Sequence, residues 1–393
     1  MSADQSQPTR PDAREFLDIF LNDIPMIDTL APVEFEKGAF PTSVSLPLMT
    51  NSEREQVGTC YKQQGQEEAI RLGHQLVQGE IKQQRVQAWV NFAQQHPQGY
   101  LYCWRGGLRS QICQQGMHED GTDYPRITGG YKAMRSWILA EFERQCAELP
   151  MIILAGTTGC NKTGLLNQLP NSVDLEGLAN HLGSSFGRRP SGQPSQLNFE
   201  NALAVAMLKA EHSNSVQSGQ HLVLEDESML IGRCALPHLF RNAMERSPVV
   251  VLDTSLEERV EHTFHNYILT KLAEWQQQMT DEDEEPAFDA FANDLTESLK
   301  RVKKRLGGVR YAEVANEMEN ALSAHRHGNP DGHRGWITVL LRDYYDPMYE
   351  YQLSKKMERV IFQGNRTEVK EFLSRTEHGA QPSPADISPS QPG

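Results

Sequence analysis

The first candidate for chemistry is a cysteine that follows a short apolar run, in the stretch 99-GYLYCWRGGLRSQ-111. A thiol becomes nucleophilic when its pKa falls, which happens near arginines, among converging backbone N–H groups, or at a helix N-terminus. The stretch can supply all three, because arginines carry charge, glycines let the loop curl, and a serine can cap a following helix. We therefore predict an anion-binding loop that activates one thiol, built from Cys103, Arg105, Gly106, Gly107, Arg109 and Ser110.

The Cys-x5-Arg spacing of this loop is shared by two chemistries. In cysteine phosphatases the thiolate attacks phosphorus, whereas in rhodanese-type transferases it accepts sulfur or selenium and holds that atom within a ring of amides. Tyr102 rather than histidine precedes the cysteine, and no motif places a general-acid aspartate, which argues against a phosphatase. Spacing alone leaves phosphorus, sulfur and selenium open. A structural role is the preferred interpretation for the cysteines without such surroundings, Cys60, Cys113, Cys146 and Cys234.

A second motif, 156-GTTGCNKT-163, follows the apolar run 151–156 and precedes a stretch that could open a helix. In a P-loop of pattern G-x-x-x-x-G-K-[ST], backbone N–H groups wrap phosphates, the lysine reaches them and the hydroxyl can hold Mg²⁺. Asn161 stands where the pattern has glycine, and asparagine is the residue that best tolerates the left-handed backbone after glycine. We predict a phosphate site rather than efficient nucleotide hydrolysis, formed by Gly156, Thr157, Thr158, Gly159, Lys162 and Thr163.

Acidic residues end a further apolar run, 222-LVLEDES-228. From the end of such a strand an acidic side chain commonly reaches the magnesium ion of a P-loop. Acidic strand ends are frequent, so this prediction depends on the P-loop beside it. We expect Glu225 or Asp226 near a magnesium ion or the bound phosphates.

The composition restricts the class of protein. A chain of 393 residues usually forms more than one core, so we expect two domains. The formal net charge of −14 argues against indiscriminate nucleic-acid binding, although it is compatible with a local basic groove. Six cysteines without a CxxC pair indicate a reducing compartment, and neither a signal peptide nor a membrane-length apolar run is visible. We therefore expect a cytoplasmic protein without membrane contact.

Short apolar runs alternate with helical stretches along the chain, which is typical of α/β domains whose sites lie at the carboxyl ends of parallel strands. In the first part we expect strands at 24–28, 43–48, 99–104 and 124–128, and helices at 81–96, 108–118 and 131–149. After Pro150 we expect strands at 151–156, 221–226 and 248–254, followed by a largely helical region. The polar ends, residues 1–13 and 378–393, are predicted to be disordered.

A basic segment of the helical region, 295-LTESLKRVKKRL-306, is the best local candidate for contacts to nucleic acid. Its apolar residues recur at helical spacing and would face a core: Leu295, Leu299, Val302 and Leu306. The cations between them would point outward: Lys300, Arg301, Lys303, Lys304 and Arg305. A merely solvated basic helix explains the pattern equally well.

Together these features resemble the tRNA 2-selenouridine synthase family, in which an N-terminal rhodanese-like domain is joined to a C-terminal P-loop domain. The resemblance covers most of the chain and includes the P-loop, 34-EFEKGAFPTSVSLPL-48, 57-VGTCYKQQG-65, 102-YCWRGGLRSQ-111, 128-TGGYKAMR-135, 180-NHLGSSFG-187, 193-QPSQLNFEN-201 and 225-EDESMLIG-232. It implies a rhodanese-like parallel-sheet domain over 14–138. It also implies a P-loop NTPase-like α/β domain with a mostly helical C-terminal part over 139–377.

The resemblance further implies a two-step change at the wobble uridine, U34, of tRNAs that carry 2-thiouridine there. The sulfur is alkylated with geranyl diphosphate, and selenium from selenophosphate then replaces the S-geranyl group to give 2-selenouridine. Alkylation suits this order, because it turns a poorly leaving thiocarbonyl sulfur into a thioether-type leaving group. By the same resemblance Cys103 matches the selenium-bearing cysteine, and Lys162 and Thr163 match the phosphate-binding pair, with Mg²⁺ as an expected ion.

The chain departs from the family pattern at three positions, with Leu30 and Leu182 in place of arginines and Asn161 in place of glycine. Two other functions are compatible with the motifs. One is a cysteine-dependent phosphatase or arsenate reductase fused to a nucleotide-binding domain, which a phosphocysteine intermediate would favour. The other is a non-catalytic tRNA-binding scaffold, which tight tRNA binding without base modification would favour.

Overall fold

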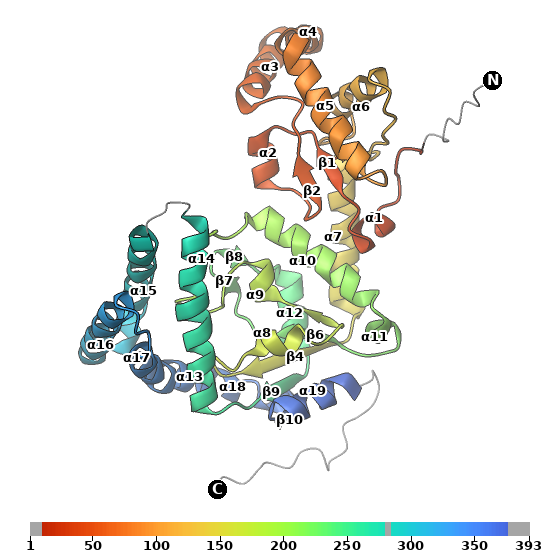
Figure 1. The fold of residues 1–393 in the computed structure, drawn as a ribbon. Coiled ribbons are helices and arrows are strands. Elements are labelled where there is room, and N and C mark those ends of the chain that lie inside the picture. Colours follow the sequence, from red (N-terminus) through yellow and green to blue (C-terminus); the bar gives the residue numbers. More distant parts are fainter. Residues whose placement is uncertain (1–9, 280–283, 376–393) are drawn as a thin grey trace, which may run out of the picture. The chain divides into compact units, whose positions relative to one another are not determined.

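The computed structural model describes residues 10–279 and 284–375, and these residues form two compact units (Figure 1). One unit comprises 10–144 and 195–209, and the other 145–194, 210–279 and 284–375. The mixed α/β class with parallel sheets and a helical C-terminal part is confirmed. Within the described ranges no helix is long and apolar enough to cross a membrane. The predicted disorder of 1–13 and 378–393 concerns residues that, apart from 10–13, lie outside the description.

A parallel sheet of three strands in the order β2-β1-β3 forms the centre of the first unit. Its strands are β1 (Met26–Asp28), β2 (Ser43–Ser45) and β3 (Tyr100–Tyr102). Asp28 pairs in register with Ser45 and Tyr102, so the carboxyl ends of all three strands lie at one edge. The strand predicted at 124–128 is reduced to isolated bridges, which include Leu101 with Arg126, because Pro125 has no N–H to donate to a ladder.

The helices of this unit are α1 (Leu17–Leu21), α2 (Pro32–Lys37), α3 (Asn51–Gln64), α4 (Gln66–Leu76), α5 (Gly79–Gln95), α6 (Leu108–Glu119), most of α7 (Gly130–Glu148) and, later in the chain, most of α10 (Gln196–Glu211). The helices predicted at 81–96, 108–118 and 131–149 are confirmed as α5, α6 and α7. A capping box starts α3, where Thr50 and Glu53 bond each other's backbone N–H groups. Ile27, Leu101, Trp89 and Cys113 belong to the hydrophobic core of this unit.

The second unit contains a five-stranded parallel sheet in the order β10-β9-β4-β6-β5. Its strands are β4 (Met151–Gly156), β5 (Ser172–Val173), β6 (Leu222–Glu225), β9 (Val249–Leu252) and β10 (Val360–Gly364). All six residues of β4 are buried, which explains its unbroken apolar sequence. Leu154 pairs with Glu225 and Gly156 with Leu252, so the P-loop and the end of β6 share one edge of the sheet.

The remaining elements of this unit are mostly helices, and a short antiparallel pair, β7 (Leu230–Ile231) and β8 (Cys234–Ala235), lies between β6 and α12 in the chain. The helices before β10 are α8 (Lys162–Leu166), α9 (Leu175–Leu178), α11 (Asn214–Gln217), α12 (His238–Arg246), α13 (Leu256–Phe264), η1 (His265–Thr270), α14 (Lys271–Gln278), α15 (Glu284–Leu306), α16 (Gly308–Arg326), α17 (His333–Leu340), η2 (Leu341–Tyr345), α18 (Asp346–Ser354) and η3 (Met357–Arg359). The last helix is α19 (Arg366–Arg375).

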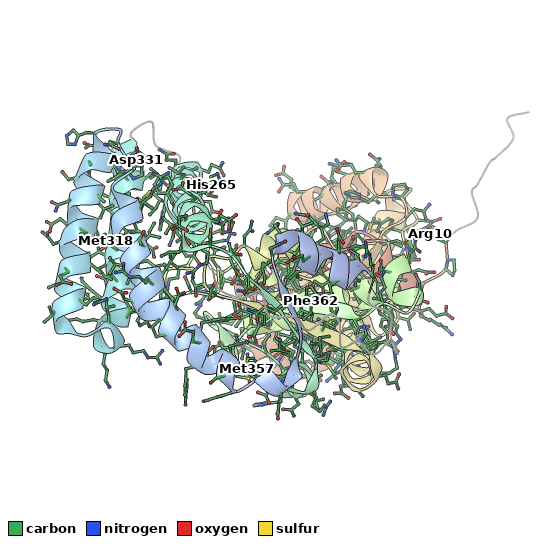
Figure 2. The ribbon with its side chains drawn as sticks, turned by 90° about the horizontal axis from the view of Figure 1, so that it is seen from below. Arg10, His265, Met318, Asp331, Met357 and Phe362 are labelled. Atoms are coloured by element: carbon green, nitrogen blue, oxygen red, sulfur yellow. The ribbon has the colours of Figure 1, made fainter. Side chains whose placement is uncertain are left out.

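The helices from α13 to η2 have a core of their own, separate from the core beneath the five-stranded sheet. Figure 2 shows these helices with Met318 and Asp331 labelled, and the sheet beside them with Phe362. Met318 is buried in the helical core, as are Leu295, Leu299 and Val302 of α15. The apolar face predicted for the basic segment is therefore confirmed.

Candidate active site: a cysteine loop and a phosphate-binding loop

Cys103 directly follows β3 and begins the loop that leads into α6. Its side chain is buried, and its Sγ lies 3.2 Å from Ser110 Oγ. Ser110 lies in the first turn of α6 and donates its hydroxyl to the carbonyl of Gly107 at 3.0 Å. A hydroxyl has a single proton and donates one hydrogen bond. The Ser110 hydroxyl can donate it to the Gly107 carbonyl while Cys103 is a thiol, and to the Cys103 sulfur when Cys103 is a thiolate.

The backbone of the cysteine loop leaves its amides free. The carbonyls of Cys103 and Trp104 accept hydrogen bonds from Tyr131 and Lys132, which fixes the loop from one side. In the described parts of the chain, the N–H groups of residues 104–107 donate no hydrogen bond. Gly106 has φ +64°, and a Cβ there would lie 2.7 Å from the amide nitrogen of Gly129, so a side chain is excluded. This arrangement fits the predicted anion-binding loop.

The arginines of this loop have different surroundings. Arg109 donates to Glu34 at 2.7 Å, and although burial alone would raise the pKa of Glu34, Arg109 lowers it. Arg105 is exposed and forms no ion pair with any residue that the structure describes. The charge of Arg109 is therefore shared with a carboxylate, whereas that of Arg105 is available to an anion.

Asp28 lies at the end of β1 beside Tyr102, and no motif pointed to it. Its carboxyl is fully buried, with Oδ1 accepting from the Leu30 amide at 2.8 Å, while Oδ2 has no hydrogen-bond partner among the described residues. Burial raises the pKa of Asp28 to about 7 despite that hydrogen bond. The only signal in the sequence was an aspartate that ends an apolar run.

The P-loop connects β4 to α8 as predicted, and Asn161 shows why glycine is dispensable there. Asn161 adopts the left-handed conformation, with φ +62° and ψ +45°. Its side chain also accepts from the amide of Gly164 at 3.1 Å and thereby caps α8. Gly159 has φ +84°, and a Cβ there would lie 2.6 Å from Thr263 Oγ1. The loop thus closes with asparagine at the position of the usual glycine.

Lys162 is held at the centre of the P-loop. Its Nζ donates to the carbonyl of Gly156 at 3.1 Å and lies 3.9 Å from the sulfur of Cys160, which is buried. Burial alone would lower the pKa of Lys162, but Cys160 and nearby carboxylates raise it above the usual value. The lysine therefore stays charged and suits a polyanionic ligand.

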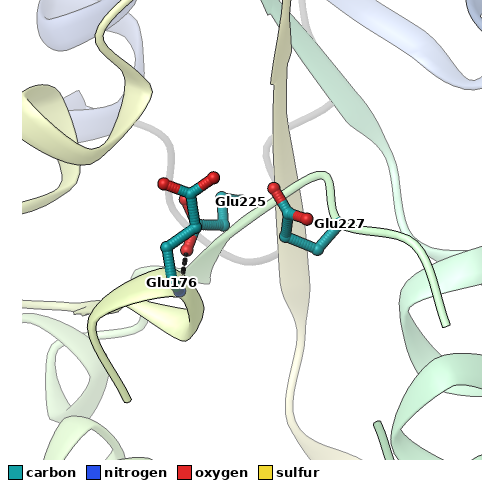
Figure 3. A group of neighbouring side chains, drawn as sticks. All are labelled: Glu176, Glu225 and Glu227. Carbon is teal, nitrogen blue, oxygen red and sulfur yellow. Dashed lines mark hydrogen bonds between the residues drawn. The ribbon is translucent and has the colours of Figure 1, made fainter. Parts of the chain in front are cut away.

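Three glutamates, Glu176, Glu225 and Glu227, lie close together (Figure 3), and Thr163 lies next to two of them. Glu176 donates its backbone N–H to Glu225 at 2.7 Å, and Thr163 Oγ1 lies 3.4 Å from Glu176 and 3.5 Å from Glu225. One carboxylate oxygen from each of Glu176, Glu225 and Glu227 lies within 4.8 Å of the others. Burial raises the pKa of all three, that of Glu227 to about 8. Repulsion by Glu176 adds to the rise for Glu225 and Glu227, whereas Lys162 opposes the rise for Glu176.

The sequence predicted either Glu225 or Asp226 near the ligand of the P-loop, and the two carboxylates have different partners. Glu225 lies beside Thr163, but the carboxylate of Asp226 pairs with Lys356 Nζ at 2.5 Å and 2.6 Å. Of these two alternatives, Asp226 pairs with Lys356 and is not part of the glutamate group, so Glu225 stays the predicted acid. Glu176 and Glu227 take part as well. Glu176 precedes Glu225 by 49 residues, so no local spacing could have predicted the pair.

The basic segment of α15 is exposed along its cationic side. Lys300 pairs with Glu297, Arg301 donates to the carbonyl of Ser185, and Lys303 lies 4.8 Å from the ring centre of Tyr311. Lys304 and Arg305 form no ion pair within 10–279 and 284–375.

The two leucines that replace arginines of the family pattern, Leu30 and Leu182, differ in how deeply they are buried. Leu30 is fully buried next to Asp28, so its side chain is packed and contributes no charge to the cysteine loop. Leu182 is half-buried, and its carbonyl accepts from the hydroxyl of Tyr267 at 2.9 Å.

Fold and sites define a two-part α/β protein that combines an activatable cysteine with a P-loop. Residues 149–380 match the family described as "tRNA 2-selenouridine synthase AAA domain". A tRNA 2-selenouridine synthase of Hahella chejuensis is 54% identical over 93% of this chain and 95% of its own length. Those of Marinobacter nauticus and Shewanella pealeana are 49% and 51% identical, over 94% and 92% of this chain and 99% and 97% of their own. The chain belongs to the tRNA 2-selenouridine synthase family.

Among solved structures, the N-terminal domain of a protein described as ATP/GTP binding, from Clostridium difficile 630, is 28% identical over 30% of this chain and 90% of its own, with a TM-score of 0.26. A likeness at this TM-score does not bear on the fold.

Proposed function

We propose that this chain converts 2-thiouridine at the wobble position of tRNA to 2-selenouridine by way of S-geranyl-2-thiouridine. The observation that carries the proposal is the buried Cys103 at the start of a loop whose N–H groups at 104–107 donate to none of the described residues, in a chain of this family. The names of the relatives favour selenium transfer over the phosphatase, arsenate reductase and scaffold functions.

In the first step the P-loop binds the diphosphate of geranyl diphosphate. Lys162, charged and partly buried, meets the phosphate oxygens together with the loop amides. The sulfur of 2-thiouridine attacks the allylic carbon, the C–O bond breaks, diphosphate leaves with the electron pair, and the N3 proton of the base is lost to water. Thr163 and the three glutamates fit a divalent cation, because a positive charge among them would lower their raised pKa values. When bound, Mg²⁺ would neutralise charge on the departing diphosphate.

In the second step selenium from selenophosphate replaces the geranylthio group at C2 of the uracil. The C2–Se bond forms, the C2–S bond breaks, and geranylthiol leaves. Water releases the phosphate, so the overall step involves no oxidation or reduction. We propose that the loop amides and Arg105 bind the anionic donor and that the sulfur of Cys103 attacks its phosphorus, so that an S–P bond forms, the P–Se bond breaks and selenide is set free beside Cys103. The selenide attacks C2, and water then hydrolyses the S–P bond.

Two surfaces can contact the tRNA. Trp104 is exposed next to Cys103 and stacks on Tyr131 at 5.1 Å, so its outer face is available to a base. Lys300, Arg301, Lys303, Lys304 and Arg305 of α15 offer a basic strip for phosphates.

The proposal is tested with the purified chain, a tRNA that carries 2-thiouridine, geranyl diphosphate and selenophosphate, followed by mass analysis of the nucleosides. We expect S-geranyl-2-thiouridine without selenophosphate and 2-selenouridine with it. Lys162→Ala should lose geranylation, whereas Lys370→Ala, a change at an exposed lysine of α19, should keep it. Unchanged 2-thiouridine with the wild-type chain would refute the proposal.

A further inference from the structure

A large cavity opens next to the cysteine loop in the first unit. It has a volume of about 1080 Å³ and lies among α3, α4, α5 and α6. Its apolar wall includes Val57, Ile70, Val77, Trp89, Leu108 and Ile112, and we call it the α3–α6 cavity. Volumes of about 300–1,000 Å³ are typical of small-molecule sites.

The apolar wall of the cavity is continuous with the hydrophobic core of the first unit, and no other side chains pack over it within the residues that the structure describes. Val57, Val77 and Ile112 are only partly buried, yet they pack against the core of this unit. Of the residues in α3 and α4, only Cys60 and Ala69 are buried. These two helices therefore leave their apolar side facing open space, which costs free energy unless an apolar group fills it.

Charged side chains also line the cavity, and these are paired with one another. Lys82 pairs with Glu119 at 3.0 Å, and Glu34 pairs with both Arg54 and Arg109. An apolar wall together with paired charges suits an elongated hydrocarbon whose one end is attached to a polar group.

The cavity reaches the reacting loop itself. Leu108 and Arg109 line it, and Arg109 is the arginine of the Cys-x5-Arg motif. In the proposed second step, selenium attacks the carbon that bears the geranylthio group, so the geranyl chain must begin close to Cys103.

We propose that the α3–α6 cavity binds the geranyl chain of S-geranyl-tRNA while selenium replaces sulfur at C2. The proposal rests on the proposed function and adds to it a binding site for the leaving group. The cavity is large enough for a ten-carbon chain, whereas the apolar cavity beside Thr158 of the P-loop measures only about 20 Å³. Binding in the α3–α6 cavity makes the enzyme select geranylated over short-chain S-alkyl tRNA.

The test compares two substrates in the second step alone. The purified full chain is given selenophosphate with tRNA that carries either S-geranyl-2-thiouridine or S-methyl-2-thiouridine, and kcat and KM are measured for each. The wild type should prefer the geranyl substrate by about tenfold or more in kcat/KM, since pockets discriminate chain length at least this well. Ile70→Asp, which places a charge in the apolar wall, should abolish this preference by raising KM for the geranyl substrate only.

Matched variants separate the cavity from general damage to α4. Leu76→Asp changes another half-buried apolar residue of α4 that does not line the cavity, and Ile70→Leu keeps the wall apolar. Both should keep the geranyl preference. As a measurement without catalysis, binding of the nucleoside S-geranyl-2-thiouridine should weaken about tenfold or more in Ile70→Asp and stay unchanged in Leu76→Asp.

The outcomes distinguish the two levels of the proposal. A wild type that converts both substrates equally well, or an Ile70→Asp variant that keeps the preference, would overturn the cavity proposal and leave the proposed function standing. A wild type that converts neither substrate would overturn the proposed function and this inference with it.

Discussion

At the scale of single residues, burial separates side chains of the same type into different roles. Cys113 and Cys103 are both buried, and burial raises the pKa of Cys113, as suits the structural role predicted for it. Cys103 instead lies beside the hydroxyl of Ser110 and at the start of a loop with free amides. Glu225 and Asp226 are adjacent in the chain, yet one faces Thr163 and the other pairs with Lys356. Neighbours in space, which local sequence cannot specify, decide these roles.

Asp28 makes the stability of the protein depend on pH. Its pKa is about 7 in the folded chain and near 3.8 when unfolded, so between these values the folded state holds a proton that the unfolded state has lost. The free energy of unfolding is therefore unaffected by Asp28 ionisation below about pH 4. It decreases as pH rises from about 4 to about 7, by up to about 4 kcal/mol. Asp28→Asn removes this dependence. Denaturant unfolding should show the variant gaining stability relative to wild type from pH 4 to 7, and parallel profiles would contradict this account.

Asn161 combines a left-handed backbone with a helix cap, so two substitutions there should differ. Asn161→Ala loses the cap and strains the backbone, which should cost about 2 kcal/mol. Asn161→Gly loses the cap but relieves the strain, and should change stability by only a few tenths of a kcal/mol. Urea unfolding measures both free energies. Equal stability of the two variants would show that the positive φ is unimportant.

At the scale of elements, the sequence predicted those with strong apolar patterns. The buried strands β4, β6 and β9 and the helices α5, α6 and α7 were all visible as continuous or periodic apolar runs. Strand β10 was missed because it is an edge strand that is only partly buried. Helices α3 and α4 were missed because both are rich in polar residues and several of their few apolar residues face the open α3–α6 cavity. Glu225 of the glutamate group was predicted, but Glu176 was missed because it comes from a distant segment of the chain.

Several cations on the basic side of α15 should contribute together to tRNA binding. Lys304→Gln with Arg305→Gln should weaken tRNA binding and lower the slope of log K against log salt by about 1 to 2. The control is Arg334→Gln with Arg342→Gln, because these arginines already pair with acidic residues. Affinity measured by filter binding between 50 and 200 mM salt, roughly the range in which phosphate contacts are most visible, tests this prediction. An equal loss in the control pair would assign the effect to net charge alone.

At the scale of the whole molecule, the chain joins two units that each have a core and a candidate site. Its formal net charge of −14 means that tRNA must be bound by local groups against an unfavourable overall field. Because the cysteine loop and the P-loop belong to different units, the two proposed steps should be separable by single substitutions.

The most direct measurement supplies each variant with tRNA that is already geranylated, adds selenophosphate, and quantifies 2-selenouridine by mass analysis. Lys162→Ala should still form 2-selenouridine, because its defect lies in the step that has been bypassed. Cys103→Ser should form none and leave S-geranyl-2-thiouridine unchanged. Formation of 2-selenouridine by Cys103→Ser at the wild-type rate would contradict the central claim that Cys103 delivers the selenium.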